Sequence, residues 1–191
     1  MKKRIVIGIS GASGSILAYE LLTVFRKLPE WETHLVVSSG GEQTIALETD
    51  HSLQDYIDLA DYYHNNSNIG ASIASGTFRT EGMIIVPCSM KTVAGVASGY
   101  SDNLLLRAAD VTLKEGRKLV LVTRETPLSR IHLKNMLEAC EAGAVILPPM
   151  MSFYNGAQTG ADMASHIVGK ILDRFDISYD HFHRWDPENN E

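Results

Sequence analysis

An adjacent cation and carboxylate, Arg124 and Glu125, directly follow the apolar run Leu119–Thr123. Such a pair has no role in a protein core, so its place at the end of a predicted buried strand indicates a ligand site. Arginine is suited to two-pronged contact with a phosphate, and glutamate is suited to passing a proton to or from a reacting group. The pair therefore predicts phosphate binding combined with acid–base chemistry.

A glycine-rich turn, Ser10–Gly14, follows the first apolar run and leads into a predicted helix. The free N–H groups and the dipole of a helix N-terminus favour phosphate. The glycine spacing is not that of a dinucleotide fingerprint. The second strand ends in Ser38 and Ser39, where a nicotinamide site needs an acidic residue. A mononucleotide phosphate fits better, although a tight turn that needs small residues explains the segment equally well.

The segment Pro87–Thr92 follows the run Gly82–Val86. Ser89 can cap the next helix and places Lys91 in its first turn, where a lysine opposes the helix dipole and is expected to have an anionic partner. Cys88 lies far from any histidine in the sequence, so we interpret it as a core residue rather than a nucleophile.

Three further cations lie on predicted helices. Arg107 and Lys114 share a face of the helix predicted from Asn103 to Glu115, and Lys170 lies on the last amphipathic helix. Each of them alone is more often part of a solvated face. The segment Pro148–Tyr154, with its prolines and aromatic pair, fits either a pocket wall or simple packing.

Five short apolar runs predict the strands that position these residues. They are β-branched and do not alternate, as is typical of parallel strands buried on both faces. They alternate with helical segments, which predicts an α/β fold: a three-layer α/β/α, Rossmann-like doubly wound parallel sheet that binds ligands at the carboxyl ends of its strands. The predicted strands are Ile5–Ile9, Thr33–Val37, Gly82–Val86, Leu119–Thr123 and Ala144–Leu147.

Helical periodicity fills the gaps between the strands. A first helix is predicted from about Ser13 to Lys27, and two apolar stripes with helical spacing are expected to be buried. The segment Asp61–Thr80 is predicted as a surface loop followed by a short apolar turn. The stripes are Leu133, Met136, Leu137 and Cys140, and then Met163, Ile167, Ile171 and Phe175 with Leu172.

Length and composition predict one domain, residues 1–175, followed by a tail, residues 176–191, whose aromatic residues indicate that it docks. A net charge of −6 argues against a nucleic-acid surface. The apolar run after Met1 is too short for a signal peptide or a membrane span, and two cysteines form no disulfide framework. We therefore expect a cytoplasmic protein. The histidine spacing indicates no metal site, so we also expect the protein to be metal-independent.

Six motifs in register, from about residue 4 to residue 185, make the chain resemble the UbiX-type flavin prenyltransferases, a family that includes the small "B" subunits of phenolic acid decarboxylases. The resemblance implies transfer of a dimethylallyl group from dimethylallyl phosphate to N5 and C6 of reduced FMN. It also implies homo-oligomers, often dodecamers, with sites at subunit junctions, and a UbiD-type decarboxylase of aromatic acids as recipient. The motifs are 8–14, 75–80, 87–92, 107–115, 124–128 and 148–154.

The resemblance also implies roles for individual residues. The catalytic group comprises Glu125 helped by Ser13, Glu48 as the acid near flavin N5, and Trp185 in the tail as the aromatic cover of the prenyl chain. The residues that correspond to FMN ligands are Gly11, Ala12, Ser13, Ser38, Ser89, Met90, Lys91, Thr92 and Arg124. Those that correspond to ligands of the prenyl phosphate are Arg107, Lys114, Arg124, Tyr154 and Lys170.

The chain departs from the family pattern at Met151 and Ala157, where many relatives carry proline, and this loosens the predicted loop around Tyr154. Two other functions remain open. One is an FMN-dependent cysteine decarboxylase, for which His64 is the only rough candidate catalytic histidine. The other is a non-catalytic flavin-carrying subunit of an aromatic acid decarboxylase, which would not need Glu125 or a cluster of phosphate ligands.

Overall fold

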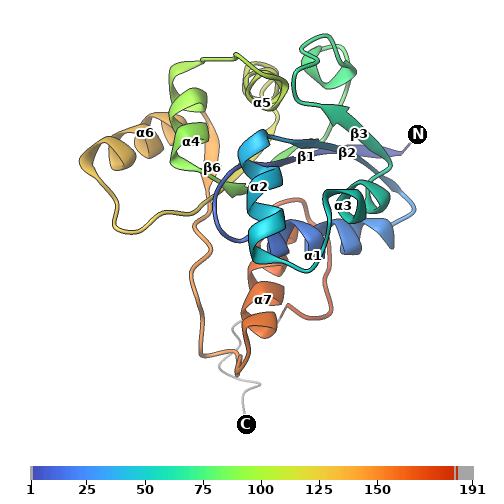
Figure 1. Ribbon diagram of the computed structural model, residues 1–191, viewed down its shortest axis with the longest axis vertical. Coiled ribbons are helices and arrows are strands. Elements are labelled where there is room, and N and C mark those ends of the chain that lie inside the picture. Colours follow the sequence, from blue (N-terminus) through green and yellow to red (C-terminus); the bar gives the residue numbers. More distant parts are fainter. Residues whose placement is uncertain (1, 183, 185–191) are drawn as a thin grey trace.

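A parallel sheet of six strands, in the order β3-β2-β1-β4-β5-β6, forms the centre of the computed structural model, which describes residues 2–182 and 184 (Figure 1). The order reverses between β1 and β4, which makes the carboxyl ends of these strands the expected ligand position. The predicted doubly wound sheet is confirmed. The strands are β1 (Lys3–Ile9), β2 (Trp31–Val37), β3 (Tyr62–Asn65), β4 (Gly82–Cys88), β5 (Lys118–Thr123) and β6 (Ala144–Ile146).

Helices cover both faces of the sheet, and each layer encloses its own apolar core (Figure 1). The first face carries α1 (Ser15–Arg26), α2 (Ser39–Glu48), α3 (Leu53–Leu59) and α7 (Gly160–Asp173). The second face carries the 3-10 turn η1 (Ser72–Ala74), α4 (Met90–Ser98), α5 (Leu104–Lys114) and α6 (Arg130–Glu141). Residues from α5 and α7 therefore lie on opposite sides of the sheet.

The five predicted strands are present with small shifts at their ends, but the prediction of a loop over Asp61–Thr80 is wrong in part. The edge strand β3 pairs with β2 there and is short, polar and exposed, so it carries no apolar signal. The prediction also lacks α2 and α3. The segment Ser39–Gly41 reads as a turn, yet it forms the first turn of α2, where a side chain at Gly41 would lie 2.6 Å from the carbonyl oxygen of Ile9.

The prediction of a buried stripe on α6 is also wrong for the single chain. Leu133 and Leu137 are 53% and 59% exposed, and Cys140 is exposed as well. The helix packs on the second core mainly through the small residue Ala139, which is fully buried, so the larger side chains face outward. The stripe on α7 is confirmed for Ile167, Ile171, Leu172 and Phe175, which are buried in the first core, whereas Met163 is only half-buried.

A chain of polar side chains fixes the β2–β3 edge of the sheet. The Glu32 carboxylate accepts hydrogen bonds from Arg4 Nε at 2.7 Å and His34 Nε2 at 3.0 Å. His34 Nδ1 lies 3.0 Å from Nε2 of His64 on β3. The ring of Phe78 covers both Arg4 and His34. Burial lowers the pKa of both histidines below the usual range, although the Glu32 carboxylate opposes this at His34.

These histidines should make stability depend on pH. Because both pKa values are lowered in the folded chain, the unfolded chain binds more protons once the pH falls below about 6.5, and acidification then favours unfolding. We expect the thermal midpoint to fall further between pH 7.5 and 5.5 in the native protein than in His64→Gln, which keeps a donor for His34. Equal losses in the two proteins would contradict this role.

Candidate functional site

Loops from β1 and β4 are joined at the carboxyl edge of the sheet. The Ser10 hydroxyl donates to the Pro87 carbonyl at 3.0 Å and accepts from Ser89 N–H at 2.8 Å. The strand β4 continues through Pro87 rather than ending before it. The β1 loop also touches the start of α2, since a side chain at Gly11 would lie 3.0 Å from the backbone of Gly40. Glycine is therefore needed where these backbones meet.

A cavity of about 210 Å³ opens where these loops meet. It lies at the point where the strand order reverses, as expected for a doubly wound sheet. Five of the predicted FMN ligands line it together. The lining residues are Gly11, Ser38, Ser39, Gly40, Ser89, Lys91, Thr92, Asn103, Leu105 and Leu106.

Two helix N-termini face this cavity. Ser38 caps α2 by accepting from Gly41 N–H at 3.1 Å, and Ser89 caps α4 by accepting from Thr92 N–H at 3.3 Å. The first N–H groups of such helices have no partner within the helix and, with the dipole, favour an anion. Lys91 adds a full positive charge at the same place. This donor set fits the phosphate of a mononucleotide such as FMN.

The N-terminus of α5 lies beside the same cavity but is already capped. Asn66 accepts from Leu104 N–H at 2.8 Å through its carbonyl and from Leu105 N–H at 2.9 Å through its side chain. Asn103 accepts from Leu106 N–H at 3.0 Å. This helix therefore contributes an apolar wall, and the anion position belongs to α2 and α4.

The remaining predicted FMN ligands lie around the cavity. Ala12 and Ser13 are half-buried in the β1 loop, whereas Met90 is 8% exposed and packs into the second core. Arg124 is placed beside the β4 loop because its N–H donates to the Cys88 carbonyl at 3.1 Å. Cys88 itself is fully buried, and burial raises its pKa far above the usual range, which confirms its interpretation as a core residue.

Glu48 holds the N-terminus of α1, which has no side-chain cap of its own. Its carboxylate accepts from Gly14 N–H at 2.9 Å, and from the N–H and hydroxyl of Ser15 at 3.3 and 3.1 Å. Burial opposes ionisation, but hydrogen bonds from Ser13, Gly14 and Ser15 prevail and lower the pKa of Glu48. A charged carboxylate is thus fixed next to the glycine-rich turn.

Arg124 and Glu125 are both exposed at the end of β5. The Glu125 carboxylate accepts from Thr126 N–H at 3.0 Å, which orients it within its own turn. The pair thus lies at the same edge of the sheet as the cavity, where a second ligand could meet both a cation and a proton donor or acceptor.

The predicted phosphate-binding cations do not gather in one chain. Arg107 pairs with Asp110 on its own helix, and Lys114 pairs with Glu115. Along α5 these two cations are about 10 Å apart at a rise of 1.5 Å per residue. Lys170 lies on α7, across the sheet from α5. Within one chain, the cations of α5 and the cation of α7 therefore lie on opposite sides of the sheet.

Tyr154, in contrast, lies in the β6–α7 loop and contacts the same part of α7 that carries Lys170. The Tyr154 ring meets the ring of His166 edge to face, with centroids 5.9 Å apart. Phe182 of the tail contacts His166 with centroids 5.3 Å apart, and Lys170 Nζ lies 5.7 Å from the Phe182 centroid. The structure thus connects two of the five predicted prenyl-phosphate ligands through the tail.

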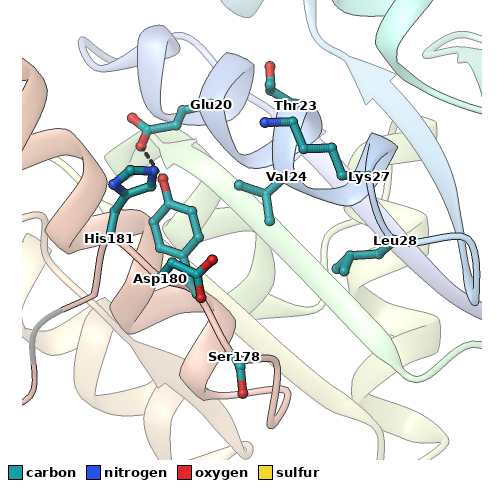
Figure 2. Close-up of a pocket in the computed structure, with 9 residues that line it drawn as sticks. Glu20, Thr23, Val24, Lys27, Leu28, Ser178, Asp180 and His181 are labelled. Carbon is teal, nitrogen blue, oxygen red and sulfur yellow. Dashed lines mark hydrogen bonds between the residues drawn. The ribbon is translucent and has the colours of Figure 1, made fainter.

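The tail is anchored as far as the structure describes it. Figure 2 shows Glu20 of α1 and Lys27, just after α1, on one side of a hollow of about 250 Å³, with Ser178, Asp180 and His181 of the tail on the other. The Tyr179 hydroxyl donates to Glu20 at 2.8 Å, and burial followed by this bond raises the pKa of Tyr179 to about 12. This hollow flanks the later turns of α1, away from the glycine-rich turn, so it is a docking groove and not part of the anion site.

Trp185, the predicted aromatic cover, lies outside the described residues. Sequence reasoning did not assign to the site the residues that complete the cavity, namely Ser39, Gly40, Asn103, Leu105 and Leu106. Asn103 carried a usable signal, because asparagine before an apolar helix is a common N-cap. In the described parts of the chain there is no cluster of histidine, cysteine or acidic residues that could hold a metal, and no helix there has the length and apolarity to span a membrane.

The fold and the anion site define a flavin-binding α/β protein, and the model of the family described as Flavoprotein matches residues 1–176. The chain is 54% identical over 188 residues to a probable UbiX-like flavin prenyltransferase of Sedimentibacter hydroxybenzoicus, covering 98% of this chain and 100% of that one. Within the flavoproteins, the chain therefore belongs to the family of UbiX-like flavin prenyltransferases.

Two solved structures are similar to the chain at 50% identity. One is AnUbiX (PadA1) in complex with FMN and dimethylallyl pyrophosphate, with a TM-score of 0.95 over 97% of this chain and 98% of that one. The other is described as a dodecameric FMN-dependent UbiX-like decarboxylase from Escherichia coli O157:H7, with a TM-score of 0.94 over 96% of this chain and 99% of that one.

Proposed function

We propose that this protein transfers a dimethylallyl group from dimethylallyl phosphate to N5 and C6 of reduced FMN. The observation that carries the proposal is the coincidence, at one edge of the sheet, of an anion cavity with the Arg124–Glu125 pair. Family membership and the ligands of AnUbiX support it. The reduced flavin supplies the nucleophilic positions of the reaction when it is bound.

The residues of this chain divide the remaining work. The N-termini of α2 and α4 with Lys91 hold the flavin phosphate, and Glu48 and Ser13 border the ring. Arg124 stabilises the phosphate that leaves when the allylic C–O bond breaks, and Glu125 handles its proton. Aromatic faces at Tyr154 and Trp185 shelter the positive charge that develops on the allylic carbons.

The site is completed by neighbouring chains in this proposal. A cavity of about 210 Å³ is smaller than the roughly 300–1,000 Å³ of sites that enclose a drug-sized ligand, so one chain encloses only part of FMN. The loop before Tyr154 exposes Met150, Met151 and Phe153 by 66–72%, which is unusual for a monomer surface. A homo-oligomer, a dodecamer like the Escherichia coli relative, covers these residues in this proposal.

The prenylated flavin serves a UbiD-type decarboxylase of aromatic acids in the cytoplasm, which follows from the resemblance to the family. A cysteine decarboxylase is a weaker reading, because His64, the candidate histidine, is held against His34 at the edge of the sheet.

The mass of the flavin tests the proposal. We expect incubation of the protein with reduced FMN and dimethylallyl phosphate to add one five-carbon unit to most of the flavin, as measured by mass spectrometry after extraction. Heat-denatured protein is the control. A flavin that stays bound with unchanged mass would overturn the proposal and favour the carrier function, whereas decarboxylation of a cysteine peptide would favour the other alternative.

A further inference from the structure

We propose that Phe182 is a positioning residue of the prenyl-phosphate site, which it serves by holding Lys170 and, through His166, Tyr154. The inference rests on the proposed function, in which these two residues bind the prenyl phosphate. It assigns a role to a tail residue outside the motifs of the sequence analysis.

Phe182 reaches α7 because position 169 has no side chain. A Cβ at Gly169 would lie 2.4 Å from Cβ of Phe182 and 2.5 Å from two of its ring carbons. Cβ and Cγ of Phe182 cannot be moved away by rotation at the end of a flexible side chain, so the tail backbone itself would have to move. The close approach of the tail to α7 therefore depends on glycine at this position.

From this position the Phe182 ring meets three groups: the ring of His166 and the cations of Lys170 and Arg184, the latter with its guanidinium carbon 5.3 Å from the ring centroid. Lys170 Nζ lies 5.7 Å from the ring centroid, within the range of a cation–π contact, which restricts an otherwise flexible side chain. The Phe182 ring also contacts the ring of His166, which in turn meets the Tyr154 ring edge to face. One aromatic ring thus couples a cation on α7 to an aromatic residue of the β6–α7 loop.

Further contacts hold the tail in this position along α7. Tyr179 donates to Glu20, which also accepts from the hydroxyl of Ser165 on α7. Arg184 pairs with Asp173 at the end of α7. Anchors on both sides of Phe182 mean that its placement is fixed by the chain and not by the ring alone. Preorganised ligands lose less freedom when a phosphate binds, so affinity for the prenyl phosphate should depend on this arrangement.

Substitution of Gly169 tests the inference with a matched control on the same helix. Both Gly169→Ala and Gly160→Ala add one methyl group to α7, but the methyl group at position 160 enters open space. The binding of dimethylallyl phosphate is measured by calorimetry on protein loaded with oxidised FMN, so that no transfer takes place. We expect Kd to rise about tenfold for Gly169→Ala and to stay at the native value for Gly160→Ala, with FMN affinity unchanged in both.

Two further variants separate positioning from folding. Phe182→Leu adds no atom against α7 but lacks the ring, and should also raise Kd, whereas Phe182→Tyr should restore it. If Gly169→Ala also loses FMN, the inference is tested instead by comparing the Kd for dimethylallyl phosphate of Phe182→Leu with that of Phe182→Tyr. Native Kd in Gly169→Ala or Phe182→Leu would overturn the inference. Native protein that binds the ligand but never prenylates FMN would instead overturn the proposed function.

Discussion

Glu125→Gln is expected to slow prenyl transfer by about 10²–10⁴-fold, the usual contribution of a positioned acid or base. Glutamine keeps the size of the side chain and can still accept from Thr126 N–H, the contact that orients Glu125 in its turn. It cannot carry the proton, however. The affinity for FMN should stay within about twofold of the native value, because Glu125 does not line the anion cavity.

The rate is measured in single turnovers with saturating dimethylallyl phosphate, so that binding does not contribute. Glu141→Gln is the matched control, since this carboxylate is exposed at the end of α6 and far from the β5 loop in sequence. Turnover at the native rate in Glu125→Gln would remove Glu125 from the mechanism and leave the electrostatic effect of Arg124 as the contribution of this loop.

Lys170→Ala is expected to have the second large effect, a rise of about 10–100-fold in KM for dimethylallyl phosphate, the range expected for a lost charged hydrogen bond. FMN affinity should not change, because Lys170 lies on α7 and away from the cavity at the carboxyl edge of the sheet. Arg174→Ala, which removes an exposed cation just after the same helix, is the control. Equal KM values for the two variants would show that Lys170 does not bind this phosphate.

The strands of the sheet were predictable because buried parallel strands leave continuous apolar runs. Gly82–Cys88, for example, is buried along its whole length. The edge strand Tyr62–Asn65 was not predictable, because three of its four side chains are exposed and its position depends on hydrogen bonds with β2. The first turn of α2 was missed for a different reason. Its glycines disfavour a helix locally, and they are explained by tertiary contacts, of Gly40 with Gly11 and of Gly41 with Ile9 of β1.

The anion site was predictable from loops that end neighbouring strands, and Gly11, Ser38, Ser89, Lys91 and Thr92 do line one cavity. The prenyl-phosphate site was not predictable as one site, because its predicted residues come from α5, the loop after β5, the β6–α7 loop and α7, on different sides of one chain. The apolar stripe of Leu133 and Leu137, predicted as buried, is exposed in the single chain. A helical period indicates that a face will be covered, but it does not say whether the cover comes from the same chain.

In the proposed function, residues on separate surfaces of this chain meet in one site between chains. Arg124 and Glu125 follow β5, whereas the C-terminal end of α7 lies near the other end of that strand, where Lys118 contacts the Arg174 carbonyl. A strand of six residues spans about 20 Å. Glu125 and Lys170 of one chain are thus expected to serve different sites.

Mixed oligomers test this claim most directly. Glu125→Gln and Lys170→Ala chains are unfolded together in equal amounts, refolded, and assayed for prenyl transfer at a low concentration of dimethylallyl phosphate. If each site takes Glu125 from one chain and Lys170 from another, about one quarter of the sites regain both native residues and activity rises well above that of either parent. Activity equal to the average of the two parents would contradict the claim.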